Sequence, residues 1–263
     1  MLFSTIITSY KTHDVTAAHV REIMRFPVKP DEIIVVDDAG DPGLRDLLFN
    51  LKRTVPVTYA KILQDISWNY TGARNLGIWL SRGKYLASED SDNIPDPTFY
   101  PLAIQLLDEH PGVHKVVSQT RRKITIDEIS KPLEEWRTCG SRPRHIHSGL
   151  YRRSSVVAAK AFNEEFAGFY GRAEFGLVIR FNAISQNKEA VCYDRKYGCA
   201  VLKGAHYYVM CGLEDRDGFN RRSRVHNIKL HKAARKRFED TGIFTHPKGI
   251  LNFDYGVEIL DLN

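Results

Sequence analysis

The sequence predicts an α/β protein with a mainly parallel β-sheet flanked by helices. Three observations lead to this prediction. Over the first 118 residues, short runs rich in β-branched residues alternate with amphipathic segments of helical length, a pattern typical of βαβ units. Polar and acidic residues directly follow several of these runs. A basic segment with helical character lies near the C-terminus.

The individual elements follow from apolar spacing and from residues that start or stop helices. Asp14 can cap a helix, and Asp41-Pro42 supplies a cap followed by proline at the first helical position. Gly83 ends a third helix. The predicted strands cover residues 3–8, 32–36, 56–60, 85–88, 113–118 and 147–152. The predicted helices cover residues 15–26, 42–51, 71–81, 98–109, 155–162, 173–182 and 224–238.

The chain divides into three parts by pattern. Residues 1–118 carry the regular alternation, and residues 119–144 are irregular and charged, as expected for a loop that faces an acceptor. We therefore expect a nucleotide-binding half over 1–118 and an acceptor-facing half of the same domain over 119–215. A basic helix and tail follow over 216–263.

Composition restricts the class of protein. No apolar stretch approaches the roughly 18–20 residues that a membrane-spanning helix needs. Met1 leads directly into the first predicted strand, with no secretory leader between them. The four cysteines have no metal-type spacing and are few for a disulfide framework, so we expect reduced thiols and a cytoplasmic location.

An acidic cluster, Glu89-Asp90-Ser91-Asp92, follows a short apolar run and precedes the stiff segment Asn93-Ile94-Pro95. Two carboxylates held two residues apart at the end of a strand suit a divalent cation and the phosphates that it carries. An Asp-x-Asp pair is also common in solvated turns. The flanking apolar residues favour the metal-binding interpretation.

Two more polar clusters, Thr8-Ser9-Tyr10 and Asp37-Asp38, follow other predicted strands. Ligands of parallel sheets bind beyond the carboxyl ends of the strands. We therefore expect the three clusters to meet in one nucleotide site.

Together these segments resemble the inverting, nucleotide-sugar-dependent glycosyltransferases of family 2, which have the GT-A fold. The resemblance is carried by the runs before and including Tyr10 and Asp38, by Gly72-Ala73-Arg74-Asn75, and by Gly83-Lys84-Tyr85-Leu86 leading to Asp90-Ser91-Asp92. It covers about the first 115 residues well, and a looser second stretch runs from His147 to Arg180.

The resemblance implies a role for each cluster. Thr8, Ser9, Tyr10 and Asp38 would bind the nucleoside, and a carboxylate at Asp38 could accept the N3 proton of uracil. Arg74 would reach the diphosphate or brace the acidic loop. Asp90 would contact the ribose or the waters of the metal, and Asp92 would bind Mn²⁺ or Mg²⁺, which neutralises charge on the departing diphosphate.

In the second stretch, the resemblance places the general base on Glu174, which would deprotonate the acceptor hydroxyl. The chain departs from the family pattern here, because Arg172 replaces a glycine and Ala173 replaces an acid. His206 lies where relatives sometimes carry a further metal ligand or a phosphate contact, although a histidine beside two tyrosines is more often a packed residue. Arg221 and Arg222 could fold over the diphosphate as part of a lid.

Eight basic residues and no acidic residue lie between Gly218 and Phe238, and without them the formal net charge of +6 would be negative. This basic segment allows a solvated helix, attachment to an anionic membrane that holds a lipid-linked acceptor, or binding of nucleic acid. We rank a glycan or lipid-linked acceptor first and DNA with hydroxymethylated bases second.

Two other functions compete with glycosyl transfer. A nucleotidyltransferase would usually need a glycine-rich basic loop after the first strand, and Thr8-Ser9-Tyr10-Lys11-Thr12 has no glycine. An inactive polyanion-binding module would fit the basic segment and the lost acid at Ala173, but the intact Asp38, Asp90 and Asp92 oppose it.

Overall fold

The computed structural model describes residues 2–38, 43–143, 148–168, 176–177, 180–181, 199–211, 221–242 and 256–262. In these ranges, ten strands form one sheet. The strands are β1 (Phe3–Ser9), β2 (Glu32–Asp38), β3 (Val57–Ile62), β4 (Tyr85–Asp90), β5 (Asn93–Pro95), β6 (Lys115–Ile124), β7 (Gly140–Pro143), β8 (Gly149–Arg152), β9 (Cys199–Met210) and β10 (Val257–Asp261).

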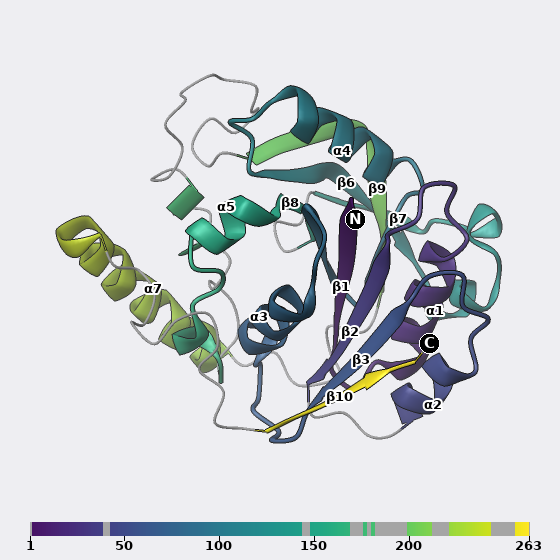
Figure 1. The fold of residues 1–263 in the computed structure, drawn as a ribbon, viewed down its shortest axis with the longest axis horizontal. Coiled ribbons are helices and arrows are strands. Elements are labelled where there is room, and N and C mark those ends of the chain that lie inside the picture. The colour runs from purple at the N-terminus through teal and green to yellow at the C-terminus, as the bar shows by residue number, and fades with distance from the viewer. Residues whose placement is uncertain are drawn as a thin grey trace.

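Helices cover both faces of this sheet (Figure 1). The α-helices are α1 (His13–Ile23), α2 (Gly43–Phe49), α3 (Tyr70–Leu80), α4 (Phe99–Glu109), α5 (Arg153–Ala158) and α7 (Arg221–Thr241). Short 3₁₀ helices are η1 (Ile126–Ser130), η2 (Leu133–Glu135) and η3 (Glu164–Phe166). The α/β fold predicted from the sequence is confirmed.

The sheet has a parallel half and a mixed half. Its order is β10-β3-β2-β1-β4-β8-β6-β9-β5, and β7 pairs with β6 outside this row. Strands β1 to β4 pair only in parallel with one another. Beyond β4 the pairing is mostly antiparallel, although β6 and β9 run parallel. The mainly parallel arrangement therefore describes the N-terminal half.

Alternating side chains along the strands separate two cores. Ile7 and Val35 point to one face, where they pack with side chains of α1, α2 and α4. Ile6 and Ile34 point to the other face, where they pack with side chains of α3 and α5. This period-2 alternation, buried on both faces, is expected of a central parallel sheet covered by helices.

The structure differs from the sequence expectations in the second half. Strand β6 continues to Ile124, across the expected boundary at residue 118 and into the region expected to be irregular. Strands β5, β7, β9 and β10 were not predicted. Strand β10 lies in the expected tail, yet it pairs antiparallel with β3 in the central sheet (Figure 1).

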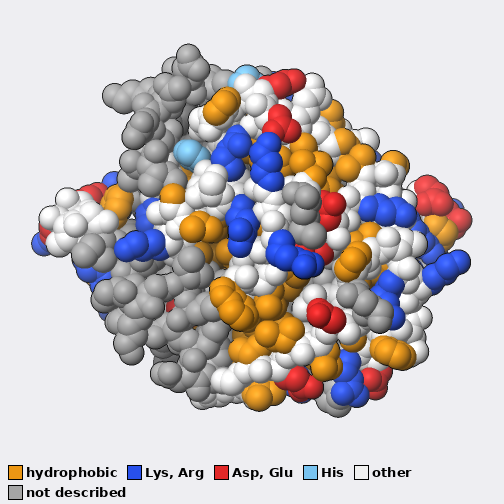
Figure 2. All heavy atoms as spheres, in the orientation of Figure 1, with side chains coloured by type: hydrophobic (Ala, Val, Ile, Leu, Met, Phe, Trp, Pro, Cys, Tyr) orange, Lys and Arg blue, Asp and Glu red, His pale blue; other side chains and the backbone are white. Residues whose placement is uncertain are grey.

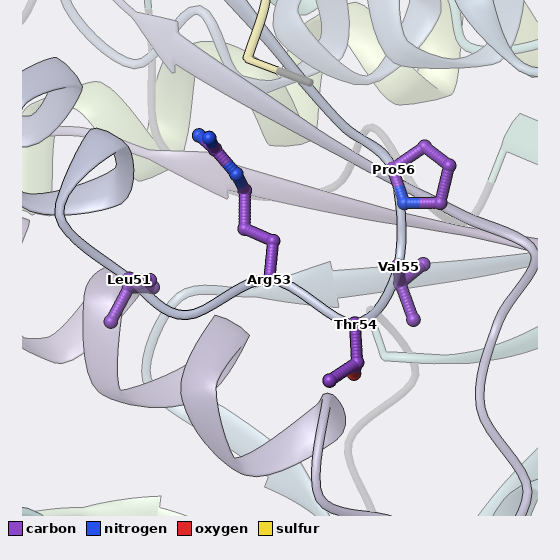
Figure 3. A pocket seen from close by; sticks show the side chains of 5 residues that line it. All are labelled: Leu51, Arg53, Thr54, Val55 and Pro56. Carbon is purple, nitrogen blue, oxygen red and sulfur yellow. The ribbon is translucent and has the colours of Figure 1, made fainter.

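The described helices include none with the length and apolar character needed to cross a bilayer. A shallow hollow of about 450 Å³ lies in the connection from α2 to β3 and is lined by Leu51, Arg53, Thr54, Val55 and Pro56 (Figure 3). This connection enters the amino end of β3. The hollow therefore lies away from the carboxyl edge, where the polar clusters are found.

Candidate active site

The carboxyl ends of β1, β2 and β4 bring the three predicted polar clusters together. In the sheet, Thr8 of β1 is aligned with Asp90 of β4 on one side and with Val36 of β2 on the other. Ser9 is aligned with Asp37. Because these strands are parallel and adjacent, their polar ends share one edge, as the sequence predicted.

Asp38 ends β2 as a buried carboxyl group, with only 4% of its surface exposed. Its Oδ1 accepts a hydrogen bond from Nδ2 of Asn69 at 3.1 Å. Burial raises the pKa of Asp38 to about 7, against the effect of the Asn69 hydrogen bond, and the nearby Asp65 and Asp37 raise the pKa further. Asp38 can therefore hold or release a proton near neutral pH.

The neighbouring Asp37 has a different environment. Its Oδ2 accepts a hydrogen bond from the hydroxyl of Tyr59 at 2.8 Å inside the core. Burial is also the main reason that the pKa of Tyr59 is raised. Of the adjacent pair, Asp37 is thus tied to β3, and Asp38 lies at the end of the strand.

Arg74 braces the acidic loop. Its fully buried guanidinium forms an ion pair with Asp90. It also lies over the rings of Tyr70 and Phe162, at 5.2 and 5.5 Å from their centroids. Of the two roles expected for Arg74, the structure places it in contact with the acidic loop.

Asp92 is half-buried, and its Oδ1 accepts a hydrogen bond from Nδ2 of Asn93 at 2.7 Å. Burial, together with the charge of Asp90, raises the pKa of Asp92 to about 7. Its backbone oxygen accepts a hydrogen bond from Met210 N at 3.2 Å, which fixes the loop to β9. Two carboxylates that repel each other in this way favour a bound cation.

His206 is not brought to these aspartates. Its Nε2 lies 3.5 Å from Oδ2 of Asp96, and its ring packs against Tyr208. Met210, whose N–H donates a hydrogen bond to the backbone oxygen of Asp92, lies four residues after His206 on β9. Four residues of extended chain span about 13 Å. In the described part of the chain, no group of three or more His, Cys, Asp or Glu side chains could hold a metal. The expected set of Asp90, Asp92 and His206 is therefore not assembled there.

The residues after β1 have separate partners. Thr8 Oγ1 donates a long hydrogen bond of 3.5 Å to the backbone oxygen of Glu89. Ser9 points inward, with its hydroxyl 2.8 Å from that of Thr16. The hydroxyl of Tyr10 donates to Asp65 at 3.3 Å. Tyr10 is therefore the member of this cluster that reaches toward the β3–α3 connection.

A network under the acidic loop was not foreseen from the sequence. Thr12 of the β1–α1 turn and Ser91 of the loop have hydroxyl oxygens 2.8 Å apart. His19 of α1 is fully buried, and its Nδ1 lies 3.2 Å from the backbone oxygen of Ser91. Burial lowers the pKa of His19 to about 3, so it is neutral at ordinary pH. The sequence around His19 does not indicate these contacts, because they depend on a loop about 70 residues away along the chain.

Glu89 was expected to belong to the acidic surface cluster, but it points into the core. It is fully buried, and its Oε1 accepts hydrogen bonds from Tyr207 at 2.8 Å and from Tyr100 at 3.4 Å. Burial raises its pKa well above the usual value. Glu89 thus anchors the end of β4 to β9 and α4, whereas the next residue, Asp90, is partly exposed and pairs with Arg74.

Three predicted site residues receive less structural description. Glu174, with Arg172 and Ala173 beside it, lies outside the described residues. Arg221 and Arg222 lie in the first turn of α7. The described part of the predicted site therefore consists of the strand-end clusters and the acidic loop.

An α/β sheet whose carboxyl edge carries these aspartates has the GT-A arrangement. The family described as "Glycosyl transferase family 2" matches residues 4–167, which is more than half of the chain. The chain belongs to glycosyl transferase family 2.

Solved structures of S. aureus TarS share the fold. The fragment 1–349 aligns with a TM-score of 0.56 and 17% identity, covering 80% of this chain and 60% of that chain. The same fragment in complex with UDP-GlcNAc aligns with a TM-score of 0.54 and 16% identity, covering 80% and 58%. At such identities the likeness concerns the fold alone.

A curated relative, "Uncharacterized protein y4gI" of Sinorhizobium fredii, is 27% identical over 157 residues. The match covers 57% of this chain and 16% of that protein. The chain therefore spans only a small part of this relative and less than two thirds of the TarS fragment.

Proposed function

We propose that this chain is a metal-dependent glycosyltransferase domain that moves a sugar from a UDP-sugar to an acceptor hydroxyl with inversion. The observation that carries this proposal is the meeting of Thr8, Asp38 and Asp90 at one edge of the parallel strands, with Asp92 two residues further on. Family membership supports it, as does the TarS fragment of the same fold that was crystallised with UDP-GlcNAc.

The nucleoside side of the site is formed by Thr8, Tyr10 and Asp38, with Ser9 and Asn69 holding the strand ends in place. An ionised Asp38 accepts the N3 proton of uracil. Asn69 donates to the Oδ1 atom of Asp38, which orients the carboxyl group. This arrangement favours uracil over cytosine, since cytosine N3 carries no proton to donate.

The residues present fit a divalent cation at Asp92. The charge of Asp90 raises the pKa of Asp92, and Arg74 already neutralises part of Asp90. Asp92 would be the direct ligand of Mn²⁺ or Mg²⁺, and Asp90 would contact the ribose or the metal's waters. When bound, the cation would supply positive charge against the diphosphate leaving group. His206 keeps its contact with Asp96 and is not included among the proposed cation ligands.

For the chemical step we retain Glu174 as the base that removes the proton of the acceptor hydroxyl as its oxygen attacks the anomeric carbon. Arg221 and Arg222 are retained as diphosphate contacts, because they open the helix that follows β9. The acceptor ranked first from the sequence is a glycan or a lipid-linked saccharide, and DNA is the alternative. We place the activity in the cytoplasm on the basis of cysteine usage.

A panel of nucleotide sugars with Mn²⁺, read by thermal shift and by UDP release, tests this function. We expect one UDP-sugar to raise the melting temperature and to be slowly hydrolysed. Asp92→Asn should abolish both effects and leave the circular dichroism spectrum unchanged. Asp96→Asn is the matched control, because Asp96 is paired with His206 away from the loop, and it should retain donor binding.

Three results would contradict the proposal. If no nucleotide sugar shifts the melting temperature in Mn²⁺, the donor assignment fails. Release of pyrophosphate from a nucleoside triphosphate, in place of nucleoside diphosphate from a nucleotide sugar, would indicate a nucleotidyltransferase. Polyanion binding with no donor binding at all would indicate an inactive binding module.

A further inference from the structure

Helix α7 has one face fixed to the body of the domain. Ala234 is buried against Phe166 of η3, and Tyr70, Leu230 and Phe238 pack around this contact. Arg237 forms an ion pair with Glu165 at 2.8 Å. Asn227 is fully buried and donates to the backbone oxygen of Phe166 at 3.5 Å. The apolar side of this helix is therefore already used inside the molecule.

The opposite face of α7 carries a lysine stripe, formed by Lys229, Lys232 and Lys236. With 100° of rotation per residue, these three lie within about 60° of one another and opposite Ala234. All three are exposed. Within the described ranges, none of them has an acidic group at ion-pair distance. The stripe thus presents three lysine charges along about 10 Å of helix.

Two acidic residues of α7 lie near the carboxyl end of this stripe. Arg235 is paired with Glu239 at 2.9 Å, and Asp240 lies on the stripe side at its carboxyl end. Figure 2 shows lysine and arginine side chains on the part of the molecule formed by α7, which projects from the body in Figure 1. The three lysine side chains are exposed in the described structure.

We propose that the lysine stripe of α7 is a docking surface for the phosphate backbone of double-stranded DNA. A row of ammonium groups on a straight helix is complementary in charge to a row of phosphates. Each contact between a lysine and a phosphate also releases condensed counterions, which favours binding. Attachment to a membrane is less well supported, since interfacial helices bury an apolar face in the lipid. Here that face packs on η3, and Val225 is the large apolar residue left exposed near the stripe.

A short chain of contacts connects this surface to the donor site. Glu164 of η3 accepts a hydrogen bond from Asn75 of α3 at 2.7 Å, and Asn75 also donates to the backbone of Phe162. The adjacent Arg74 is paired with Asp90. DNA held on α7 would therefore have a fixed position relative to the donor. The docking of DNA on α7 does not depend on the proposed glycosyl transfer. A role of the same DNA as the acceptor rests on that proposed function.

The docking is tested by fluorescence anisotropy of a labelled 20-base-pair duplex with the full chain, titrated at several salt concentrations. The test variant is Lys229→Gln/Lys232→Gln/Lys236→Gln. The control variant, Lys29→Gln/Lys52→Gln/Lys61→Gln, removes the same charge outside α7. We expect the slope of log K against log[salt] to fall by about 3 in the test variant, since each lost phosphate contact contributes about 0.9. The control variant should keep the slope of the unmodified chain.

Parallel measurements distinguish this proposal from its alternatives and from the proposed transferase function. The test variant should keep the thermal shift with UDP-sugar and Mn²⁺, so that loss of DNA binding is not loss of fold or donor site. Absence of duplex binding by the unmodified chain at low salt would overturn the docking proposal, as would equal loss in both variants. The proposal would also be overturned if the test variant lost binding to vesicles containing phosphatidylserine but kept its binding to the duplex.

Discussion

At the scale of single residues, the protonation of Asp38 is the property with the clearest consequence. Its pKa is raised to about 7 mainly by burial, and the hydrogen bond that the N3–H of uracil donates is stronger to the ionised carboxylate than to the neutral acid. At pH 6 about a tenth of Asp38 is ionised, and at pH 8 about nine tenths. We therefore expect the Kd of uridine to fall about tenfold between pH 6 and pH 8, measured by calorimetry. Uridine is preferred to UDP because it has no phosphate that titrates in this range.

Asp38→Asn provides the comparison for this pH dependence. The variant should bind uridine with little change over the same range. Stability supplies a second readout, since the pKa of Asp38 is higher in the folded protein than its ordinary value of 3.8. The stability associated with protonated Asp38 is complete below about pH 4 and is lost as the pH rises through 7. A uridine affinity independent of pH in the unmodified chain would contradict the assignment.

Sequence reasoning located the residues at this scale but not their partners. Asp38, Asp90 and Asp92 were predicted because a strand end is a local feature. The contacts of Asn69, His19 and Glu89 depend on which distant segments meet, and no local pattern carries that information. His206 illustrates the same limit, because its position beside two tyrosines does not reveal that Asp96 lies opposite it in the antiparallel pairing of β5 with β9.

At the scale of elements, the close contact between α3 and β1 holds the helix that carries Arg74 against the sheet. A Cβ added at Gly77 would lie 2.3 Å from Cγ2 of Ile6, which is fully buried. Gly77→Ala would gain about 1 kcal/mol in helix propensity. Overpacking of a tight core costs about 1–3 kcal/mol, and a contact this short favours the upper part of that range. We expect a net destabilisation of about 1–2 kcal/mol by urea unfolding.

The steric cause can be checked in an Ile6→Ala background, where the obstructing methyl group is absent. There Gly77→Ala should be neutral or stabilising. Destabilisation of equal size in both backgrounds would show that the helix–strand contact is not the reason. Because α3 carries Arg74, we also expect Gly77→Ala to weaken the thermal shift with UDP-sugar.

The elements found from the sequence share one property, which is that their signal is local. Strand β2 is a continuous run of apolar β-branched residues after Glu32, and α4 is a regular amphipathic helix. Strand β9 was missed because Lys203 and Gly204 interrupt it, and Gly204 has a positive φ of 90°. Strand β5 has three residues, too few for a periodic pattern.

At the scale of the whole molecule, β10 was the least predictable element, because its partner lies about 200 residues earlier in the sequence. Its five residues are partly buried or exposed and none is fully buried, as is common in an edge strand. Leu262, directly after it, is buried in the main core, and its N–H donates to Val57 O at 3.0 Å. The C-terminal segment thus closes the edge of the sheet on the side of β3.

Removal of residues 257–263 should therefore affect the entire domain. It leaves the edge of β3 without its partner and exposes backbone groups that can pair with a second molecule. We expect a melting temperature lower by several degrees, since about 1 kcal/mol corresponds to 2–4 °C in a domain of this size, together with concentration-dependent aggregation in light scattering. Asp261→Ala is the control, because it removes the side-chain bond with Thr58 and keeps the strand. A truncated chain that melts and sediments like the full chain would show that β10 does not protect this edge.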